Sequence, residues 1–106
     1  MNAEELNELV VSALDELKGI NIVSLDVRGR SSITDFMVIA SGTSDRHVKA
    51  LADKVSERAK EAGVRPQGIE DGRDSGWVLV DLIDVVVHVM RPDVRAFYNL
   101  EKLWSV

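Results

Sequence analysis

The chain has 106 residues, of which 45% are hydrophobic and 29% are charged, and this predicts one globular domain over residues 1–106 with a substantial core. Its formal net charge of −5 disfavours nucleic-acid backbones and favours basic proteins as partners. The absence of cysteine excludes disulfides, thiolate metal sites and cysteine catalysis. No apolar run is long enough to cross a membrane and the N-terminus is acidic, unlike a signal peptide, so we expect a cytoplasmic protein that does not bind membranes.

The first half of the chain predicts two amphipathic helices separated by two strands. Apolar residues recur at helical spacing in the first and last of these segments, and Gly19 is placed to end the first helix. The segment ending at Ala40 is continuously apolar, which favours a strand buried on both faces. Thr43 or Ser44 can cap the second helix. The expected elements are a helix at Ala3–Lys18, strands at Ile20–Val27 and Phe36–Ala40, and a helix at Asp45–Ala62.

The second half predicts three strands and a last helix. Pro66 can be tolerated in an edge strand, and Pro92 suits the first turn of a helix. The expected elements are a short edge strand at Val64–Ile69, a polar loop at Glu70–Ser75, a hairpin at Trp77–Met90 and a helix from Pro92 to Trp104. The order α-β-β-α-β-β-β-α predicts an α/β fold with a mixed five-stranded sheet and helices packed on it.

The hairpin is apolar on both faces, which raises the question of what covers the second one. A turn centred on Ile83 and Asp84 places an aliphatic wall on one face, which we assign to the core: Val78, Val80, Val85, Val87 and Val89, with Leu82 near the turn. The other face pairs Trp77 with Met90, Leu79 with His88, and Asp81 with Val86. Either a helix of the same chain covers this face, or it is a docking patch, since Trp and Met are enriched in interfaces.

Several motifs resemble those of the ribosomal silencing factor family, also called Iojap-like, over nearly the whole chain. The matching stretches are Ser31–Phe36, Ala40–Val48, Trp77, Asp81–Leu82, Asp84–Val89 and Phe97–Trp104. The resemblance implies a fold similar to nucleotidyltransferases but without their catalytic residues. It also implies a non-enzymatic protein that binds the large (50S) ribosomal subunit through its protein fourteen (uL14). Bound there, such a protein blocks joining of the small subunit and represses translation when nutrients are scarce.

The resemblance also implies a set of partner-binding residues and little direct contact with RNA. These residues are Trp77, Asp81, Leu82, Met90 and Tyr98. Strict alternation points Leu82 toward the core, so it fits this set only if the turn distorts the strand. Ile83 stands where the family usually has glycine, and a turn that needs positive φ would strain this β-branched residue. We expect no cofactor and no metal, and an uncovered apolar patch predicts a weak homodimer.

Three alternatives start from other residues. Ser41-Gly42-Thr43-Ser44 precedes a helix and could hold the phosphate of a nucleotide in a nucleotidyltransferase-like enzyme, although an ordinary helix cap explains it as well. His47 and His88 could share a metal, but they lack an acid or cysteine at ligand spacing. A direct RNA site could use Arg28, Arg30, Arg46, Lys49 and Arg73, but aromatic residues for base stacking are few, and we expect Phe36 and Phe97 in the core.

Overall fold

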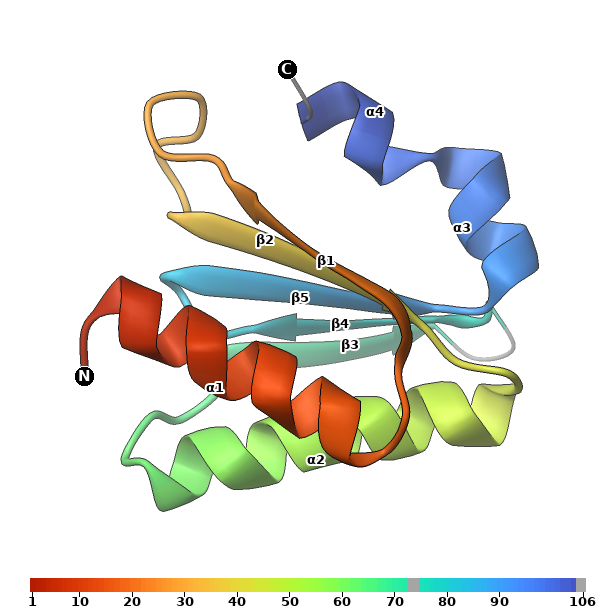
Figure 1. Cartoon of the computed structure of the whole chain (residues 1–106), viewed down its shortest axis with the longest axis horizontal. Coiled ribbons are helices and arrows are strands. Elements are labelled where there is room, and N and C mark those ends of the chain that lie inside the picture. The colour runs from red at the N-terminus through yellow and green to blue at the C-terminus, as the bar shows by residue number, and fades with distance from the viewer. Residues whose placement is uncertain (73–74, 105–106) are drawn as a thin grey trace.

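A mixed five-stranded sheet lies at the centre of the computed structural model, which describes residues 1–72 and 75–104 (Figure 1). The strand order is β1-β2-β5-β4-β3, in which β2 and β5 run parallel and the other neighbours antiparallel. This confirms the predicted mixed α/β fold. The strands are β1 (Ile20–Asp26), β2 (Phe36–Ser41), β3 (Gly68–Gly72), β4 (Trp77–Asp81) and β5 (Val85–Met90), and the helices are α1 (Ala3–Glu16), α2 (Asp45–Glu61), α3 (Pro92–Tyr98) and α4 (Leu100–Trp104).

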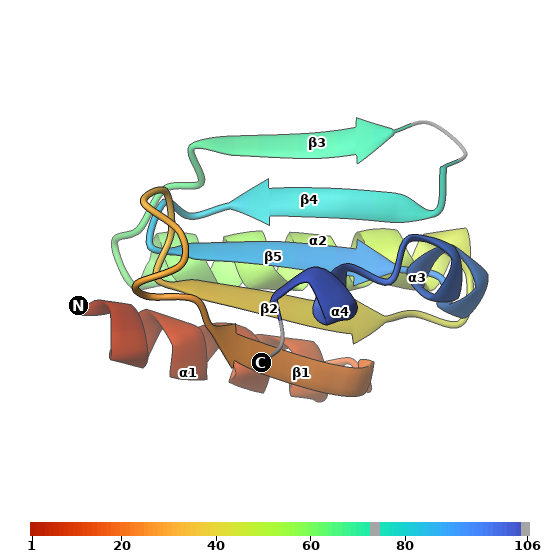
Figure 2. The same cartoon turned by 90° about the horizontal axis from the view of Figure 1, so that it is seen from above.

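The long helices α1 and α2 cover one face of the sheet, and the short helices α3 and α4 lie on the other (Figure 2). The apolar stripes that predicted α1 and α2 face the sheet, where Val10, Leu14 and Leu51 are fully buried. They pack on the aliphatic wall of the hairpin, whose predicted register is confirmed by the pairs Trp77–Met90, Leu79–His88 and Asp81–Val86. Within the described part of the chain, no helix is both long and apolar enough to span a membrane.

Two predicted elements differ from the structure. The edge strand lies at Gly68–Gly72, later in the chain than the predicted Val64–Ile69. It includes the first residues of the predicted polar loop. Residues 73 and 74 of that loop lie outside the described part of the chain. All five residues of β3 are exposed, so no apolar pattern marks it, and pairing with β4 sets its position. The last helix breaks at Asn99, whose left-handed backbone (φ 47°, ψ 54°) ends α3 and starts a new direction for α4.

The β4–β5 turn adopts the conformation that was expected to strain Ile83. The Leu82 N–H donates to the Val85 carbonyl (2.9 Å) and the Asp84 N–H donates to the Leu82 carbonyl (2.9 Å), which forces Ile83 to a φ of 70°. The Asp81 carboxylate accepts a hydrogen bond from the Ile83 N–H (2.8 Å) and stabilises the turn. Leu82 therefore keeps its side chain in the core while Ile83 projects into solvent.

Candidate protein-docking face

The second face of the sheet is covered only in part. Val27, Met37, Ile39 and Met90 form a buried cluster beneath α3 and α4, to which Val94 and Leu100 of those helices contribute. Figure 2 shows α3 and α4 over β2 and β5, whereas β3 and β4 are open in that view. Trp77, Leu79, Asp81 and Val86 are only half-buried there. Helices of the chain thus cover one portion of this face and leave the other accessible (Figure 2).

Three aromatic side chains meet where the covered and open portions join. The rings of Trp77 and Tyr98 are 4.9 Å apart between centroids, and those of Tyr98 and Phe97 are 5.0 Å apart in an edge-to-face arrangement. Tyr98 is 52% exposed and Phe97 is 81% exposed. We call Trp77, Phe97 and Tyr98 the aromatic cluster. The cluster offers a partner large apolar surfaces that are already packed against each other. Trp and Tyr are among the residue types that contribute most to binding energy at interfaces.

The expectation that Phe97 lies in the core is wrong. The helix break at Asn99 allows Leu100 of α4, together with Val94 of α3, to pack against the buried cluster around Met90. Phe97 then projects into solvent beside Tyr98. Helical periodicity carried across residues 92–104 assumes one continuous helix, so it cannot show this exchange. The left-handed Asn99, a residue type tolerant of that conformation, is the only local signal.

His88 fixes the indole ring of Trp77 from below. The Trp77 Nε1–H donates to His88 Nδ1 at 3.0 Å, so the neutral imidazole carries its proton on Nε2. The ring is buried, and burial lowers the pKa of His88 from 6.5 to about 4. At neutral pH the histidine is therefore an uncharged acceptor that orients the tryptophan rather than a charged group for a ligand.

Arg95 attaches the two short helices to the sheet, a role that the sequence did not reveal. Its buried guanidinium donates from Nε to Glu101 of α4 (2.7 Å) and from Nη1 to the Ser41 hydroxyl of β2 (3.0 Å) and the Ile20 carbonyl (3.4 Å). These bonds join α3 to α4 and both to the sheet beneath them. The six-residue separation of Arg95 and Glu101 spans the helix break, so no regular helical spacing predicts the pair.

The structure separates the five residues that the resemblance implied. Trp77, Asp81 and Tyr98 have accessible side chains, and Met90 faces the same side but is fully buried beneath them. Leu82 is 2% exposed and belongs to the core under α1 and α2, on the other face of the sheet. In this conformation Met90 and Leu82 can support a docking surface from within, whereas the other three can touch a partner.

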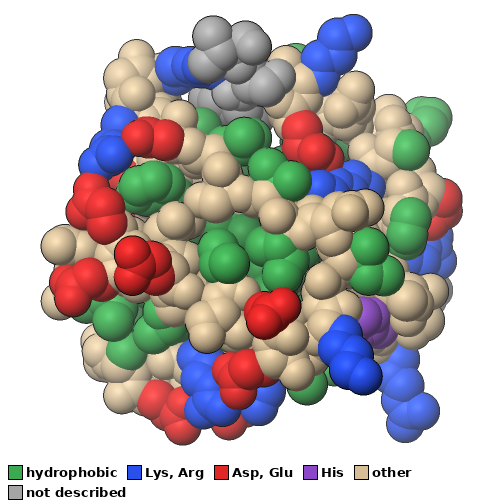
Figure 3. All heavy atoms as spheres, in the orientation of Figure 1, with side chains coloured by type: hydrophobic (Ala, Val, Ile, Leu, Met, Phe, Trp, Pro, Cys, Tyr) green, Lys and Arg blue, Asp and Glu red, His purple; other side chains and the backbone are tan. Residues whose placement is uncertain are grey.

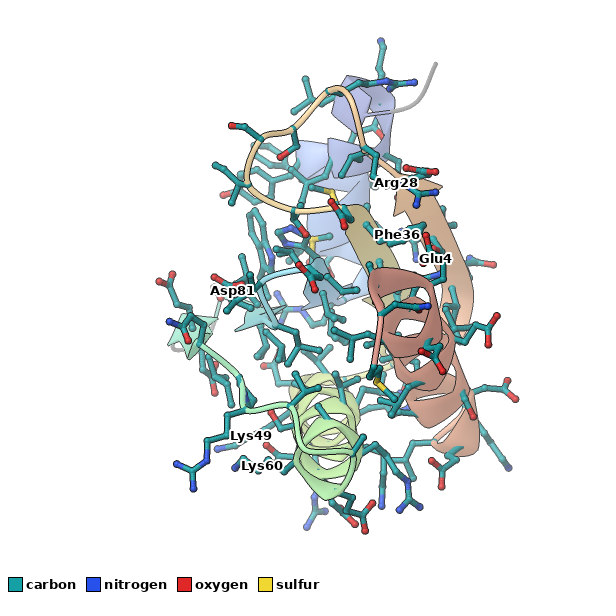
Figure 4. The ribbon with its side chains drawn as sticks, turned by 90° about the vertical axis from the view of Figure 1, so that its left-hand side faces the viewer. Glu4, Arg28, Phe36, Lys49, Lys60 and Asp81 are labelled. Carbon is teal, nitrogen blue, oxygen red and sulfur yellow. The ribbon has the colours of Figure 1, made fainter. Side chains whose placement is uncertain are left out.

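One acidic residue, Glu70, lines a shallow groove on the open portion of this face. A hollow of about 370 Å³ is lined by Glu70, Gly72, Ser75, Trp77 and Leu79. Asp81 lies at the turn end of β4, and Figure 4 shows it on the opposite side of the view from the Arg28–Glu4 ion pair. The groove thus has an apolar floor from Trp77 and Leu79 and a carboxylate at its rim.

The segment considered as an alternative phosphate site forms a helix cap. The Thr43 N–H donates to His47 Nδ1 (2.9 Å), and the Ser44 hydroxyl accepts from the His47 N–H (3.1 Å), so Ser44 is the N-cap of α2. A Cβ at Gly42 would lie 2.8 Å from the Val48 nitrogen, which explains the glycine by close packing. These contacts engage the N–H groups of Thr43 and His47 within the chain, as in an ordinary helix cap.

The two histidines have separate structural roles. His47 accepts at Nδ1 and reaches the Leu17 carbonyl with Nε2 (2.7 Å), while Nδ1 of His88 accepts from Trp77. Across residues 1–72 and 75–104, no group of three or more His, Cys, Asp or Glu is placed to hold a metal ion. The geometry therefore gives no support to a shared metal site.

The basic residues considered for RNA binding do not present a uniform patch. Arg28 pairs with Glu4 and with Asp26, and its guanidinium lies 4.9 Å from the centre of the Phe36 ring. Charges of both signs are mixed on the side of the molecule that Figure 3 shows. Arg73 lies outside the described residues.

The chain is a small α/β domain in which helices lie on both faces of a mixed sheet. The aromatic cluster is accessible beside the open strands, and such a surface is suited to binding another protein. The family model described as ribosomal silencing factor during starvation matches residues 1–106, and the chain belongs to this family. The ribosomal silencing factor of Haemophilus influenzae is 48% identical over 100 residues, which cover 94% of this chain and 98% of that protein. A crystal structure from Chromobacterium violaceum superposes with a TM-score of 0.94 at 48% identity, covering 98% of this chain and 87% of that one.

A more distant relative carries a different name. The mouse protein called mitochondrial assembly of ribosomal large subunit protein 1 is 34% identical over 102 residues, which cover 93% of this chain and 45% of the mouse protein.

Proposed function

We propose that this protein binds the large ribosomal subunit through its protein fourteen (uL14) and sterically blocks association with the small subunit, repressing translation in the cytoplasm under nutrient limitation. Membership in the ribosomal silencing factor family supports a role in translation. The name of the mouse relative points to the large subunit. The observation that carries the proposal is the accessible aromatic cluster of Trp77, Phe97 and Tyr98.

The charge of the molecule suits a ribosomal protein as partner. A chain with net charge −5 is attracted to a basic protein surface and repelled by exposed rRNA phosphates. Asp81 and Asp84 lie at the end of the hairpin that carries Trp77, where they can orient a basic partner. The aromatic cluster supplies most of the affinity, because apolar centres contribute more than rim charges.

The proposed mechanism is occlusion without chemistry. The chain extends about 32 Å along two axes and 21 Å along the third, so a bound molecule fills a volume that an approaching subunit would need. The contacts of Thr43, Ser44 and His47 account for the residues that suggested an enzyme. We infer a non-enzymatic repressor that needs no cofactor.

Alanine substitutions at Phe97 and Tyr98 test the docking face. Each should weaken binding to purified large subunits by about 2 kcal/mol, or about 30-fold, because each removes an exposed aromatic ring and little internal packing. Trp77→Ala is less suitable, since it also removes the donor to buried His88. Ile33→Ala is a matched control, because Ile33 is 81% exposed like Phe97 but lies in the β1–β2 connection.

Co-sedimentation with large subunits measures the binding, and urea unfolding checks each variant's fold. Wild-type affinity in both aromatic variants would contradict the proposed face. A separate gradient experiment adds small subunits to large subunits saturated with the protein. Unhindered joining there would disprove the silencing mechanism even if binding is intact.

The aromatic cluster also underlies the proposed weak homodimer of the free protein. Two copies could shelter the exposed Phe97 and Tyr98 rings from water by packing them together. Light scattering over a range of concentrations should then show a mass that rises with concentration, and less so for Phe97→Ala. A mass that stays monomeric at all concentrations would exclude this dimer.

A further inference from the structure

One edge of the sheet is formed by a straight and fully exposed strand. β3 pairs with β4 through five consecutive residues without a register shift, and all five of its residues are exposed. The opposite edge differs, because β1 shifts register between Ile20 and Val23 and Asn21 has a φ of 49°. Bulges and register shifts of this kind protect an edge strand from pairing with further strands. Residues 68–72 of β3 have no such irregularity in their pairing with β4.

Hydrogen bonds of the neighbouring strands show which backbone groups of β3 face outward. The Arg91 N–H donates to the Gly76 carbonyl and the Leu82 N–H to the Val85 carbonyl, both at 2.9 Å, so even-numbered residues of the hairpin's first strand bond across the hairpin. The peptide groups of the odd-numbered residues of β4 must therefore face β3. In agreement with this, the Asp81 carbonyl accepts a hydrogen bond from that side, from the N–H of Gln67 just before β3 (2.7 Å).

The same alternation assigns the peptide groups of β3 itself. Glu70 lies opposite Leu79 and directs its N–H and carbonyl to β4. Ile69 and Asp71 therefore direct theirs away from the sheet. Ile69 and Asp71 thus present two N–H donors and two carbonyl acceptors along the edge. Their spacing is that of a strand whose next neighbour, antiparallel or parallel, is missing.

The groove beside this edge indicates the chemistry of a strand that would pair there. Trp77 and Leu79 form its apolar floor and Glu70 stands at its rim. Neither Glu70 nor Asp71 forms an ion pair within the described part of the chain. An arginine or lysine of an added strand could lay its aliphatic stem on Trp77 and Leu79 and place its charge near Glu70.

The charges select against two other occupants of this edge. Pairing of β3 with β3 of a second copy would bring Glu70 and Asp71 of each chain close to the same carboxylates of the other, and such like-charge pairs are destabilising. Phosphates of RNA would meet the same repulsion. A basic extended segment of a protein avoids both costs.

We propose that β3 is a strand-addition site, at which an extended basic segment of the large-subunit partner protein pairs with Ile69 and Asp71 and forms a sixth strand. The proposal rests on the proposed function for the identity of the partner. It adds a directional backbone contact to the aromatic cluster, and alternate side chains of the added strand would enter the groove.

Proline at Ile69 tests the backbone contact. Ile69→Pro removes an outward N–H that the sheet does not use, and proline is tolerated at such edge positions. Ile69→Ala is the matched control, because it removes the side chain but keeps the N–H. Binding of Ile69→Pro to purified large subunits should be about fivefold or more weaker than that of Ile69→Ala, with equal urea unfolding midpoints for the two variants. Glu70→Lys should weaken binding to a similar extent by reversing the charge at the groove.

Amide hydrogen exchange gives an independent readout. The Ile69 and Asp71 amides should exchange quickly in the free protein and slow down at least tenfold when large subunits are bound. Equal binding of the proline and alanine variants, or unchanged exchange at both amides, would overturn strand addition while Phe97→Ala still reports on the aromatic cluster. Binding of the protein to protein-free ribosomal RNA with the same affinity as to subunits would also overturn it.

Discussion

His88 should make the stability of this fold fall between pH 7 and pH 5. Burial lowers the pKa of the folded histidine from 6.5 to about 4, whereas in the unfolded chain the histidine keeps its ordinary value. As the pH falls below 6.5 the unfolded state binds a proton that the folded state does not, so the free energy of unfolding decreases until the pH reaches about 4. Each pH unit inside this window costs about 1.4 kcal/mol, which gives a loss of about 2 kcal/mol at pH 5.

The local geometry adds a structural consequence to this loss. A protonated imidazole has no acceptor nitrogen, so the Trp77 Nε1–H to His88 Nδ1 bond must break when His88 is charged. His88→Asn supplies an amide oxygen as acceptor and does not titrate. The difference in unfolding free energy between wild type and His88→Asn should therefore shift by about 2 kcal/mol, in favour of the variant, between pH 7 and pH 5.

Urea unfolding at several pH values measures this difference. The pKa of Glu16 is lowered by its hydrogen bonds from Arg58 and that of Asp26 by those from Arg28, and both carboxylates are present in the variant as well as in the wild type. The comparison with the variant cancels the other groups that titrate in this range. Parallel curves for the two proteins from pH 7 to pH 5 would refute the reasoning that burial keeps His88 neutral.

Three further substitutions test local features of the fold. Ile83→Gly should raise the free energy of unfolding by about 1 kcal/mol, because it relieves a β-branched residue at a φ of 70° at some cost in unfolded-state entropy; an unchanged or lower urea midpoint would contradict the strain. Ser44→Ala should lower it by about 1 kcal/mol without affecting large-subunit binding, as expected of a helix cap; loss of binding with full stability would indicate a ligand site instead. Glu101→Gln should lower the thermal midpoint, because it weakens the pairing of the buried Arg95 guanidinium; an unaltered midpoint would show that the other bonds of Arg95 suffice.

The elements with strong apolar patterns were predictable from sequence. The stripes of α1 and α2 and the hairpin register follow from residues such as Leu14, Leu51 and Val80, whose burial depends on periodicity alone. The family resemblance drew attention to Ile83, because glycine is usual at this position of the turn, but it left open the φ of 70° that the structure shows. The two long helices and the hairpin are encoded by local periodicity, so one sequence is enough to find them.

The features that depend on tertiary contacts were not predictable. β3 has no buried residue and owes its position to pairing with β4. Arg95 is buried because it bonds to Ser41 and Glu101, residues that are distant or lie beyond a helix break. Phe97 was expected in the core, yet Leu100, beyond the helix break, packs there and Phe97 is exposed. In each case the deciding contact joins segments that no local pattern connects.

The misplacement of Phe97 has a physical meaning for the docking face. The left-handed Asn99 ends α3, so that Leu100 of α4 packs on the buried cluster while Phe97 remains exposed. The exposed ring carries a free-energy cost in water that the isolated chain does not recover by its own packing. Phe97 packs against Tyr98, which is itself in ring contact with Trp77, so the exposed ring belongs to the aromatic cluster of the proposed docking face. The same reasoning applies to β3, whose straight paired length leaves hydrogen-bonding groups at the edge for another chain to satisfy.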